Sequence, residues 1–168
     1  MYLEIPGITL IPQQLRMSCW YASARMLIRW RQDKVQMSVQ GLIPPEMDAK
    51  CIEIRDDNRG INNTKIIAMA QRLGLKVIPP MTAAPELLFG WLQQYGPLWV
   101  NGTRHIVVIG GMRFHPSNGW ELKVYDPAPV GSGRIEWRDL NDWFEFGNSN
   151  STRDTTKWAA LSFLHCPA

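Results

Sequence analysis

The sequence has no run of apolar residues that approaches the ~20 needed to span a bilayer. Its start, MYLEIPGITLIPQQ, has Glu4 and Pro6 where a signal peptide would carry a basic region and then an apolar run. We therefore expect no membrane partner, and no signal peptide in the chain as given.

Cysteine is also scarce, and the three cysteines, Cys19, Cys51 and Cys166, show no C-x-x-C spacing. An odd number of cysteines without paired spacing argues against a disulfide framework and against a structural zinc site. We expect a reducing working compartment, no metal and no cofactor. Cys51 and Cys166 are interpreted as small buried residues.

Charge of either sign is modest. The formal net charge is +3, and Lys and Arg are scattered along the chain instead of forming the basic patch that nucleic-acid binding requires. We therefore expect no nucleic-acid partner. A length of 168 residues is that of one ordinary domain, so a single domain is expected over residues 1–168.

The first part of the chain has helical periodicity. Ser18 is expected to be the N-cap of a helix that places Cys19 in its first turn, above a hydrophobic stripe. Helices are expected at residues 18–33, 62–73 and 85–95. Between the first two, segment 34–60 is irregular, with a short strand expected at 51–54.

After Gly96-Pro97 the period changes to that of strands. The segments are rich in Val, Ile, Trp and Tyr and are bounded by Gly, Pro, Asn and Ser. Strands are expected there at residues 98–101, 105–109, 121–125, 134–137 and 158–164, with a last helix at 140–146 and a polar loop at 147–154. One further short strand is expected earlier, at residues 75–78, between the second and third helices. Helices first and an antiparallel sheet second predict one α+β domain.

Cys19 is the candidate nucleophile. Nucleophilic catalysis by cysteine needs a thiolate, and a helix N-terminus places the partial positive charge of unpaired N–H groups beside the sulfur. The chemistry also needs a base within hydrogen-bond reach and a third group that orients this base.

His105 and Asp126 are the candidates for those two roles. His105 opens an apolar strand, whereas His115 lies in a turn and His165 lies near the C-terminal end of the chain. Asp126 ends the next strand, which Pro127 stops. Two neighbouring strand ends can place His105 and Asp126 side by side, facing the helix that carries the cysteine.

The spacing of Gln13 and Cys19-Trp20 resembles the oxyanion-glutamine and nucleophile motif of papain-like cysteine peptidases. The resemblance implies that the Gln13 side chain and the backbone N–H of Cys19 bind the oxyanion. The segments that begin at His105 and end at Asp126 resemble compact bacterial members, namely the bacteriocin-processing and type III effector peptidases.

This sequence departs from papain in two respects. His105 follows Cys19 by 86 positions, short of the roughly 130 to 150 in papain, which favours a trimmed enzyme. The third member is Asp126 where papain has Asn, which changes the charge but keeps the hydrogen-bond role. The disulfide-rich secreted branch of the family is not expected.

Each candidate residue has a structural alternative. Cys19 can be a buried core residue, His105 a satisfied histidine at a strand end, and Asp126 a turn former before proline. Gln14 stands next to Gln13 and is the alternative oxyanion donor.

Three functions follow from these residues. The first is a cysteine peptidase that cleaves protein substrates. The second uses the same triad for acyl transfer or deamidation, as transglutaminases and glutamine deamidases do. The third is a catalytically inactive fold that acts as a binding module, which the complete set of Cys19, His105 and Asp126 disfavours.

The biological expectations rest on the resemblance. Only eighteen residues precede Cys19, and none of them reads as an inhibitory pro-segment. Similarity to compact effector peptidases implies a bacterial toxin or effector for competition, held inactive in the cytoplasm of its producer by a cognate immunity protein. It would then be secreted into the cytoplasm of a target cell. A bacteriocin leader-processing peptidase is the alternative.

Overall fold

The computed structural model describes residues 1–78, 84–101, 105–140 and 163–167. The helices are α1 (Cys19–Val35), α2 (Ala49–Asp56), α3 (Asn63–Leu73) and α4 (Pro85–Tyr95), with a short 3₁₀ turn, η1 (Pro45–Met47). Within these ranges no helix is both long and apolar enough to cross a membrane.

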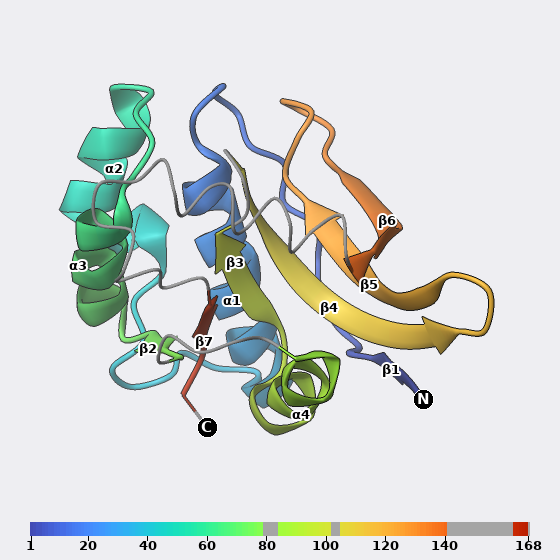
Figure 1. Ribbon diagram of the computed structural model, residues 1–168. Helices are drawn as coiled ribbons and strands as arrows, with labels where there is room; N and C mark the ends of the chain where they lie inside the picture. Colours follow the sequence, from blue (N-terminus) through green and yellow to red (C-terminus); the bar gives the residue numbers. More distant parts are fainter. Residues whose placement is uncertain (79–83, 102–104, 141–162, 168) are drawn as a thin grey trace.

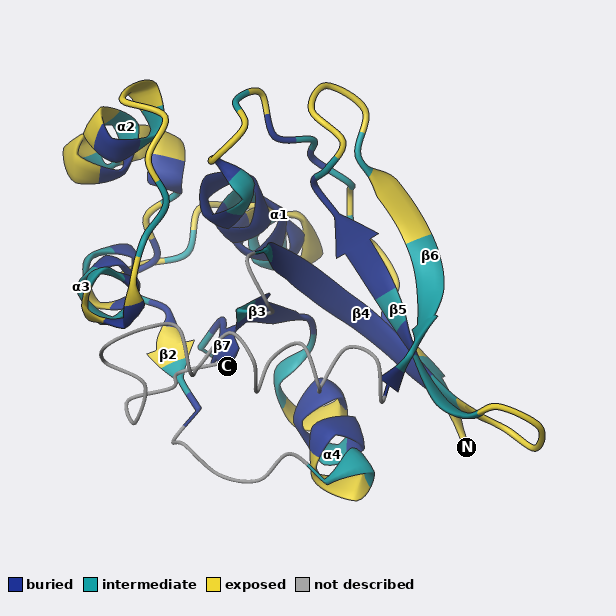
Figure 2. Ribbon diagram, turned by 45° about the horizontal axis from the view of Figure 1, so that its top comes forward, coloured by how far each residue is buried: buried dark blue, intermediate teal, exposed yellow. Residues whose placement is uncertain are grey.

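Helix α1 is the central element of the helical part, as its apolar face predicts. Ser23, Met26 and Trp30 are buried, whereas Arg29 on the opposite side is exposed. The hydroxyl of Ser23 donates to the carbonyl of Ile106 at 3.2 Å, which ties the helix to the sheet. Figures 1 and 2 show α1 between the sheet and the pair α2 and α3.

The strand expected at 51–54 is wrong, because these residues lie in α2. The carboxylate of Asp48 accepts from the Cys51 amide at 3.0 Å and so caps the helix, and it also pairs with Arg72 of α3 at 3.0 Å. Cys51 and Ile54, three positions apart, are buried on one helix face. Cys51 is buried, as expected.

Within the described ranges, seven strands form one antiparallel sheet in the order β2-β7-β3-β4-β5-β6, with β1 paired to β4. The strands are β1 (Tyr2–Glu4), β2 (Lys76–Val77), β3 (Leu98–Asn101), β4 (Ile106–His115), β5 (Gly119–Asp126), β6 (Arg134–Asp139) and β7 (Phe163–His165). The α+β class, with the helix that begins at Cys19 packed on an antiparallel sheet, is confirmed, while the pairing of β1 was not expected from the sequence.

Strand β4 extends past the expected end at residue 109, through a register shift between Ile109 and Gly111. Gly111 lies so close to β1 that a Cβ there would approach the carbonyl oxygen of Leu3 to 2.8 Å. The glycine therefore permits the β1 pairing. The predicted helix at 140–146 lies outside the described residues except for Leu140, and so does the whole predicted loop at 147–154. Of the predicted strand at 158–164, only Phe163 and Leu164 are described, and both lie in β7.

The sheet is covered on both faces, and its residues alternate accordingly. Trp99 and Val108 pack with α1 and α3, whereas Val100 and Val107 pack with α4. This period of two fixes the register of β3 and β4, because a slip by one residue would exchange the faces. The ends of β4 and β5 are thereby held beside the start of α1.

Candidate active site

Cys19 is the first residue of α1 and is half-buried. The next residue fixes the helix start: the Trp20 indole donates to the Arg59 carbonyl at 2.9 Å, and the Trp20 carbonyl accepts from the Trp99 indole at 3.2 Å. The first amides of a helix have no partner within the helix, so the N–H of Cys19 belongs to this unpaired set. The hydrogen bonds of Trp20 thus hold the start of α1, and with it the candidate nucleophile, in a fixed position.

Ser18 occupies the N-cap position, but its side chain does not cap the helix. Its hydroxyl accepts from the Leu15 amide at 3.1 Å and donates to the Leu15 carbonyl at 3.0 Å. Ser18 is thus the N-cap residue, as expected, but without a side-chain hydrogen bond to the helix amides. The hydroxyl instead closes the loop that precedes Cys19.

His105 and Asp126 lie side by side at neighbouring strand ends, as the strand pattern predicts. His105 directly precedes β4, Asp126 is the last residue of β5, and Nε2 of His105 lies 2.5 Å from Oδ1 of Asp126. The same carboxylate oxygen accepts from the Ala128 amide at 2.9 Å.

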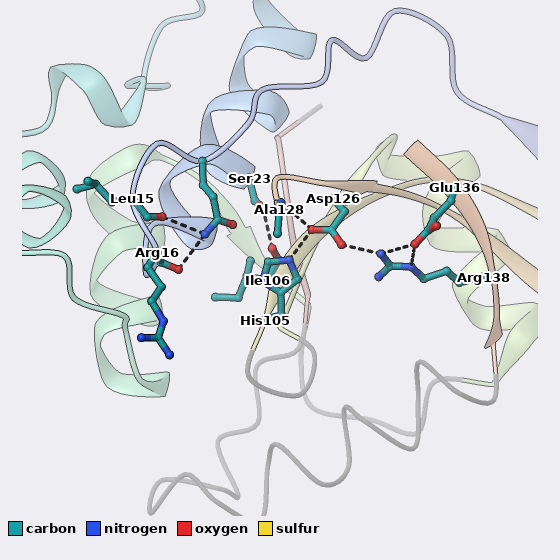
Figure 3. A network of polar contacts seen from close by, with 10 residues as sticks. Leu15, Arg16, Ser23, His105, Ile106, Asp126, Ala128, Glu136 and Arg138 are labelled. Carbon is teal, nitrogen blue, oxygen red and sulfur yellow. Dashed lines mark hydrogen bonds and ion pairs between the residues drawn. The ribbon is translucent and has the colours of Figure 1, made fainter. Parts of the chain in front are cut away.

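The second oxygen of Asp126 is held by Arg138 of β6. Nη2 of Arg138 donates to Oδ2 of Asp126 at 2.6 Å, and Nε donates to Glu136 at 2.6 Å (Figure 3). Asp126 is 4% exposed, so both of its oxygens accept their hydrogen bonds in an environment almost without access to solvent. The carboxylate has little freedom to rotate away from the imidazole.

These contacts shift two pKa values in opposite directions. Burial alone would raise the pKa of Asp126, but hydrogen bonds from His105 and Arg138 outweigh it and lower the pKa to about 2. Burial alone would lower the pKa of His105, but hydrogen bonds with Asp126 and with the Cys19 side chain outweigh it and raise the pKa to about 9. The imidazole therefore lies between the carboxylate and the thiol, and it is protonated at neutral pH.

The remaining cysteines and histidines are engaged elsewhere. Burial raises the pKa of both Cys51 and Cys166 to about 12, so these thiols are protonated and unreactive at neutral pH. His115 is exposed at the end of β4, and His165 is stacked on Tyr95 with ring centroids 3.8 Å apart.

Gln13 lies at the edge of this site and is 4% exposed. Its backbone amide donates to the Pro127 carbonyl at 2.9 Å, which ties it to the residue after Asp126. Its side-chain Nε2 donates to the carbonyls of Leu15 and Arg16 at 3.0 and 2.9 Å (Figure 3), whereas Oε1 is buried without a partner. Gln14, the alternative donor, is exposed.

A family model described as papain-like cysteine protease AvrRpt2 matches residues 4–138, which include all four candidate residues. The chain belongs to this family. It is therefore a papain-like cysteine protease, a hydrolase of peptide bonds. A search of curated proteins by sequence gives no match.

The papain-like fold of this protease is similar to a solved structure, the crystal structure of UfSP from C. elegans. The TM-score is 0.57 and the sequence identity 16%, over 85% of this chain and 32% of the other. The protease chain thus spans about a third of that structure's length. At this identity the similarity concerns the fold.

Sequence reasoning missed one residue that contacts the candidate site, Arg138. A signal for this contact was present in the sequence. Glu136 and Arg138 have opposite charges and point to the same face of β6, which pairs with the strand that ends in Asp126. In the described part of the protease, no three His, Cys, Asp or Glu side chains gather as a metal site would require.

Proposed function

We propose that this protease cleaves protein substrates with Cys19 as nucleophile, His105 as general base and acid, and Asp126 as the residue that orients the imidazole. The observation that carries the proposal is the position of the His105 ring, which lies 2.5 Å from the Asp126 carboxylate and interacts with the Cys19 side chain strongly enough that Cys19 helps to raise the pKa of His105 to about 9. This is the arrangement that activates a nucleophile in a triad.

The reaction proceeds in two halves. His105 holds the thiol proton before the sulfur of Cys19 attacks the scissile carbonyl carbon, and the tetrahedral intermediate collapses when His105 gives that proton to the leaving amine. Water, deprotonated by His105, then attacks the thioester, and the Cys19 sulfur leaves. A pKa near 9 suits His105 to hold the proton between these steps.

Gln13 is proposed as one oxyanion donor and the backbone N–H of Cys19 as the other. Nε2 of Gln13 now donates to two loop carbonyls, so donation to an oxyanion requires the amide to turn when substrate binds. Oε1 has no partner in the present orientation, so the turn costs only the two hydrogen bonds that Nε2 donates and none of the oxygen's own.

The biological role is proposed by analogy with compact bacterial peptidases. Residues 1–168 would form one protease domain of a toxin or effector that acts on proteins in the cytoplasm of a target cell. A cognate immunity protein would protect the producer, and it would bury an interface of about 1,600 Å².

Two measurements test the catalytic proposal. Limited iodoacetamide labelling near neutral pH is expected to modify Cys19 in preference to Cys51 and Cys166, whose pKa values are about 12. Mass spectrometry of cells that express the wild type is expected to find cleaved proteins that are absent with Cys19→Ala. Preferential labelling of either other cysteine would refute the nucleophile, and modified but uncleaved proteins would indicate acyl transfer or deamidation.

Growth measurements test the biological role. Wild-type protein without a partner is expected to slow the growth of the cell that makes it, whereas Cys19→Ala and His105→Ala are not. Equal growth of all three would argue for a processing peptidase of narrow specificity.

A further inference from the structure

A pocket of about 610 Å³ lies at the far end of α1 from Cys19. Its walls come from the N-terminal segment at residues 3–7, the end of α1 and the end of α4. Cys19 and Arg31, which lines the pocket, are twelve positions apart on α1, so about 18 Å separates the pocket from the nucleophile along the helix. A volume of this size is typical of sites that enclose a small molecule.

The apolar wall of the pocket is rigidly built. The Trp30 indole donates to the Pro6 carbonyl at 3.1 Å, and its ring lies against Gly96 so closely that a Cβ there would come within 2.3 Å of the ring. Gly96 also has a φ of 87°, which a side chain would strain. Tyr95 and Leu92 continue the wall.

Unpaired positive charge distinguishes this pocket. Nε of Arg31 is buried without a hydrogen-bond partner, and no carboxylate of the described residues pairs with Arg31 or with Lys34, which lies 5.1 Å from the Trp30 ring centroid. The two carboxylates that line the pocket are already engaged, Glu4 by Lys123 and Asp33 by Arg29. Among the described residues the positive charges of Arg31 and Lys34 thus stay without a carboxylate at this pocket, which favours an anionic ligand there.

We propose that this pocket binds a small ligand that joins an apolar or aromatic body to a phosphate or carboxylate group. Arg31 binds the anionic group, since guanidinium matches both anions geometrically. Lys34 adds a second positive charge at the exposed rim, and the body of the ligand lies against Trp30, Tyr95 and Leu92. The site is separate from the catalytic residues, and its existence does not depend on their roles.

Calorimetric titration with four probes tests the site. Phenyl phosphate and benzoate, which combine ring and charge, are expected to bind, and the tighter of the two identifies the anionic group. Inorganic phosphate and benzyl alcohol, which carry only one feature each, are expected to bind at least about tenfold more weakly. The tighter probe is also expected to raise the Tm of the protein. Failure of both combined probes to bind in the millimolar range would overturn the proposal.

Matched variants on α1 locate the binding. Arg31→Met, which keeps the apolar stem, is expected to weaken binding of the tighter probe by at least about tenfold. Arg25→Met is the control, because Arg25 lies six positions before Arg31 on the same helix, and neither Arg25 nor its ion-pair partner Glu46 lines the pocket. Unchanged affinity in Arg31→Met, or an equal loss in Arg25→Met, would refute the assignment.

The ligand-free variants give an independent readout. A buried unpaired N–H destabilises a fold, so Arg31→Met without ligand is expected to have a Tm equal to or above that of the wild type. A clearly lower Tm would show that the guanidinium serves the fold, which contradicts the proposal. Arg31→Lys, which keeps the charge, is a second variant for binding and is expected to bind more tightly than Arg31→Met.

Discussion

The two halves of the candidate site differ in how completely their polar groups are bound. On the sheet side, both oxygens of Asp126 accept hydrogen bonds, from His105 and Ala128 on one and from Arg138 on the other. On the helix side, the Gln13 amide donates to its own loop while Oε1 has no partner.

The comparison indicates that the sheet side is ordered before substrate binds, whereas Gln13 on the helix side must reorient. The sheet side has its geometry in place before substrate arrives, which avoids reorganisation during proton transfer. On the helix side, the proposed nucleophile Cys19 begins a well-anchored helix, whereas the side chain of the proposed oxyanion donor Gln13 is turned toward the loop. We expect substitutions on the sheet side to act through the imidazole, and substitutions of Gln13 to act only on the transition state.

Asp126→Ala tests the sheet side most severely. It removes the group that orients and charges His105, and turnover is expected to fall about a thousand-fold with little change in KM. The turnover of Asp126→Asn is expected to fall less than that of the alanine variant. Steady-state kinetics on a substrate found by the proteomic comparison measure both effects. Near-wild-type turnover of Asp126→Ala would show that His105 needs no orienting group.

Gln13→Ala tests the helix side. Turnover is expected to fall about a hundred-fold because one oxyanion donor is lost, whereas iodoacetamide labelling of Cys19 is expected to persist. Gln14→Ala is the matched control and is expected to have little effect. If Gln13→Ala lowers the Tm but not the turnover, the side chain serves only to bind the carbonyls of Leu15 and Arg16. If the effects of the two variants are reversed, Gln14 is the donor.

The difference between the halves also explains what the sequence could predict. The start of α1 at Cys19 and the strand ends at His105 and Asp126 have local signals, so the expected neighbours are neighbours in the fold. The catalytic roles of these residues stay predictions. The Arg138 contact was not predictable in the same way, because it depends on the register of β5 and β6, to which distant residues contribute.

Other misses have the same cause. Residues 51–54 form part of α2, whose cap Asp48 is held by Arg72 of another helix, and short apolar segments do not distinguish helix from strand. The orientation of the Gln13 amide depends on where the carbonyls of Leu15 and Arg16 point. No residue pattern encodes that direction.

Arg138→Met sharpens the account of the sheet side. Loss of the guanidinium frees Oδ2 of Asp126 and removes a hydrogen bond that lowers its pKa, so we expect the pKa of Asp126 to rise. Turnover at neutral pH is expected to fall about tenfold, with a larger fall as the pH approaches 4, and Arg138→Lys is expected to recover part of the loss. The pH profile of Cys19 alkylation measures this without a substrate.

Two comparisons control the Arg138 experiment. Arg113→Met removes an ion pair with Glu121 elsewhere on β4 and β5, and it is expected to leave the pH profile unchanged. In an Asp126→Asn background, Arg138→Met is expected to lower turnover less than it does in the wild type. The amide NH₂ of the introduced asparagine and the Arg138 guanidinium are both hydrogen-bond donors, so no hydrogen bond between them is lost. An unchanged profile in Arg138→Met would show that Ala128 and His105 alone hold Asp126 in place.

The smallest expected effect is on stability, and it concerns the ionised His105–Asp126 pair. The pKa of His105 is raised to about 9 in the folded protein from 6.5, so the folded state binds the proton more tightly than the unfolded state. The resulting stabilisation is complete below pH 6.5 and is lost as the pH rises to about 9, and we expect about 1–3 kcal/mol of unfolding free energy to disappear across that window. Asp126 stays charged throughout it, since its pKa is about 2, and Cys51 and Cys166 stay protonated, since theirs are about 12.

Urea unfolding of the wild type and of His105→Gln over this range measures the difference, in which the other titrating groups cancel. An equal decline in both proteins would show that the charged imidazole contributes nothing to the fold, and the sheet side would then be bound in geometry without being stabilised by its charges.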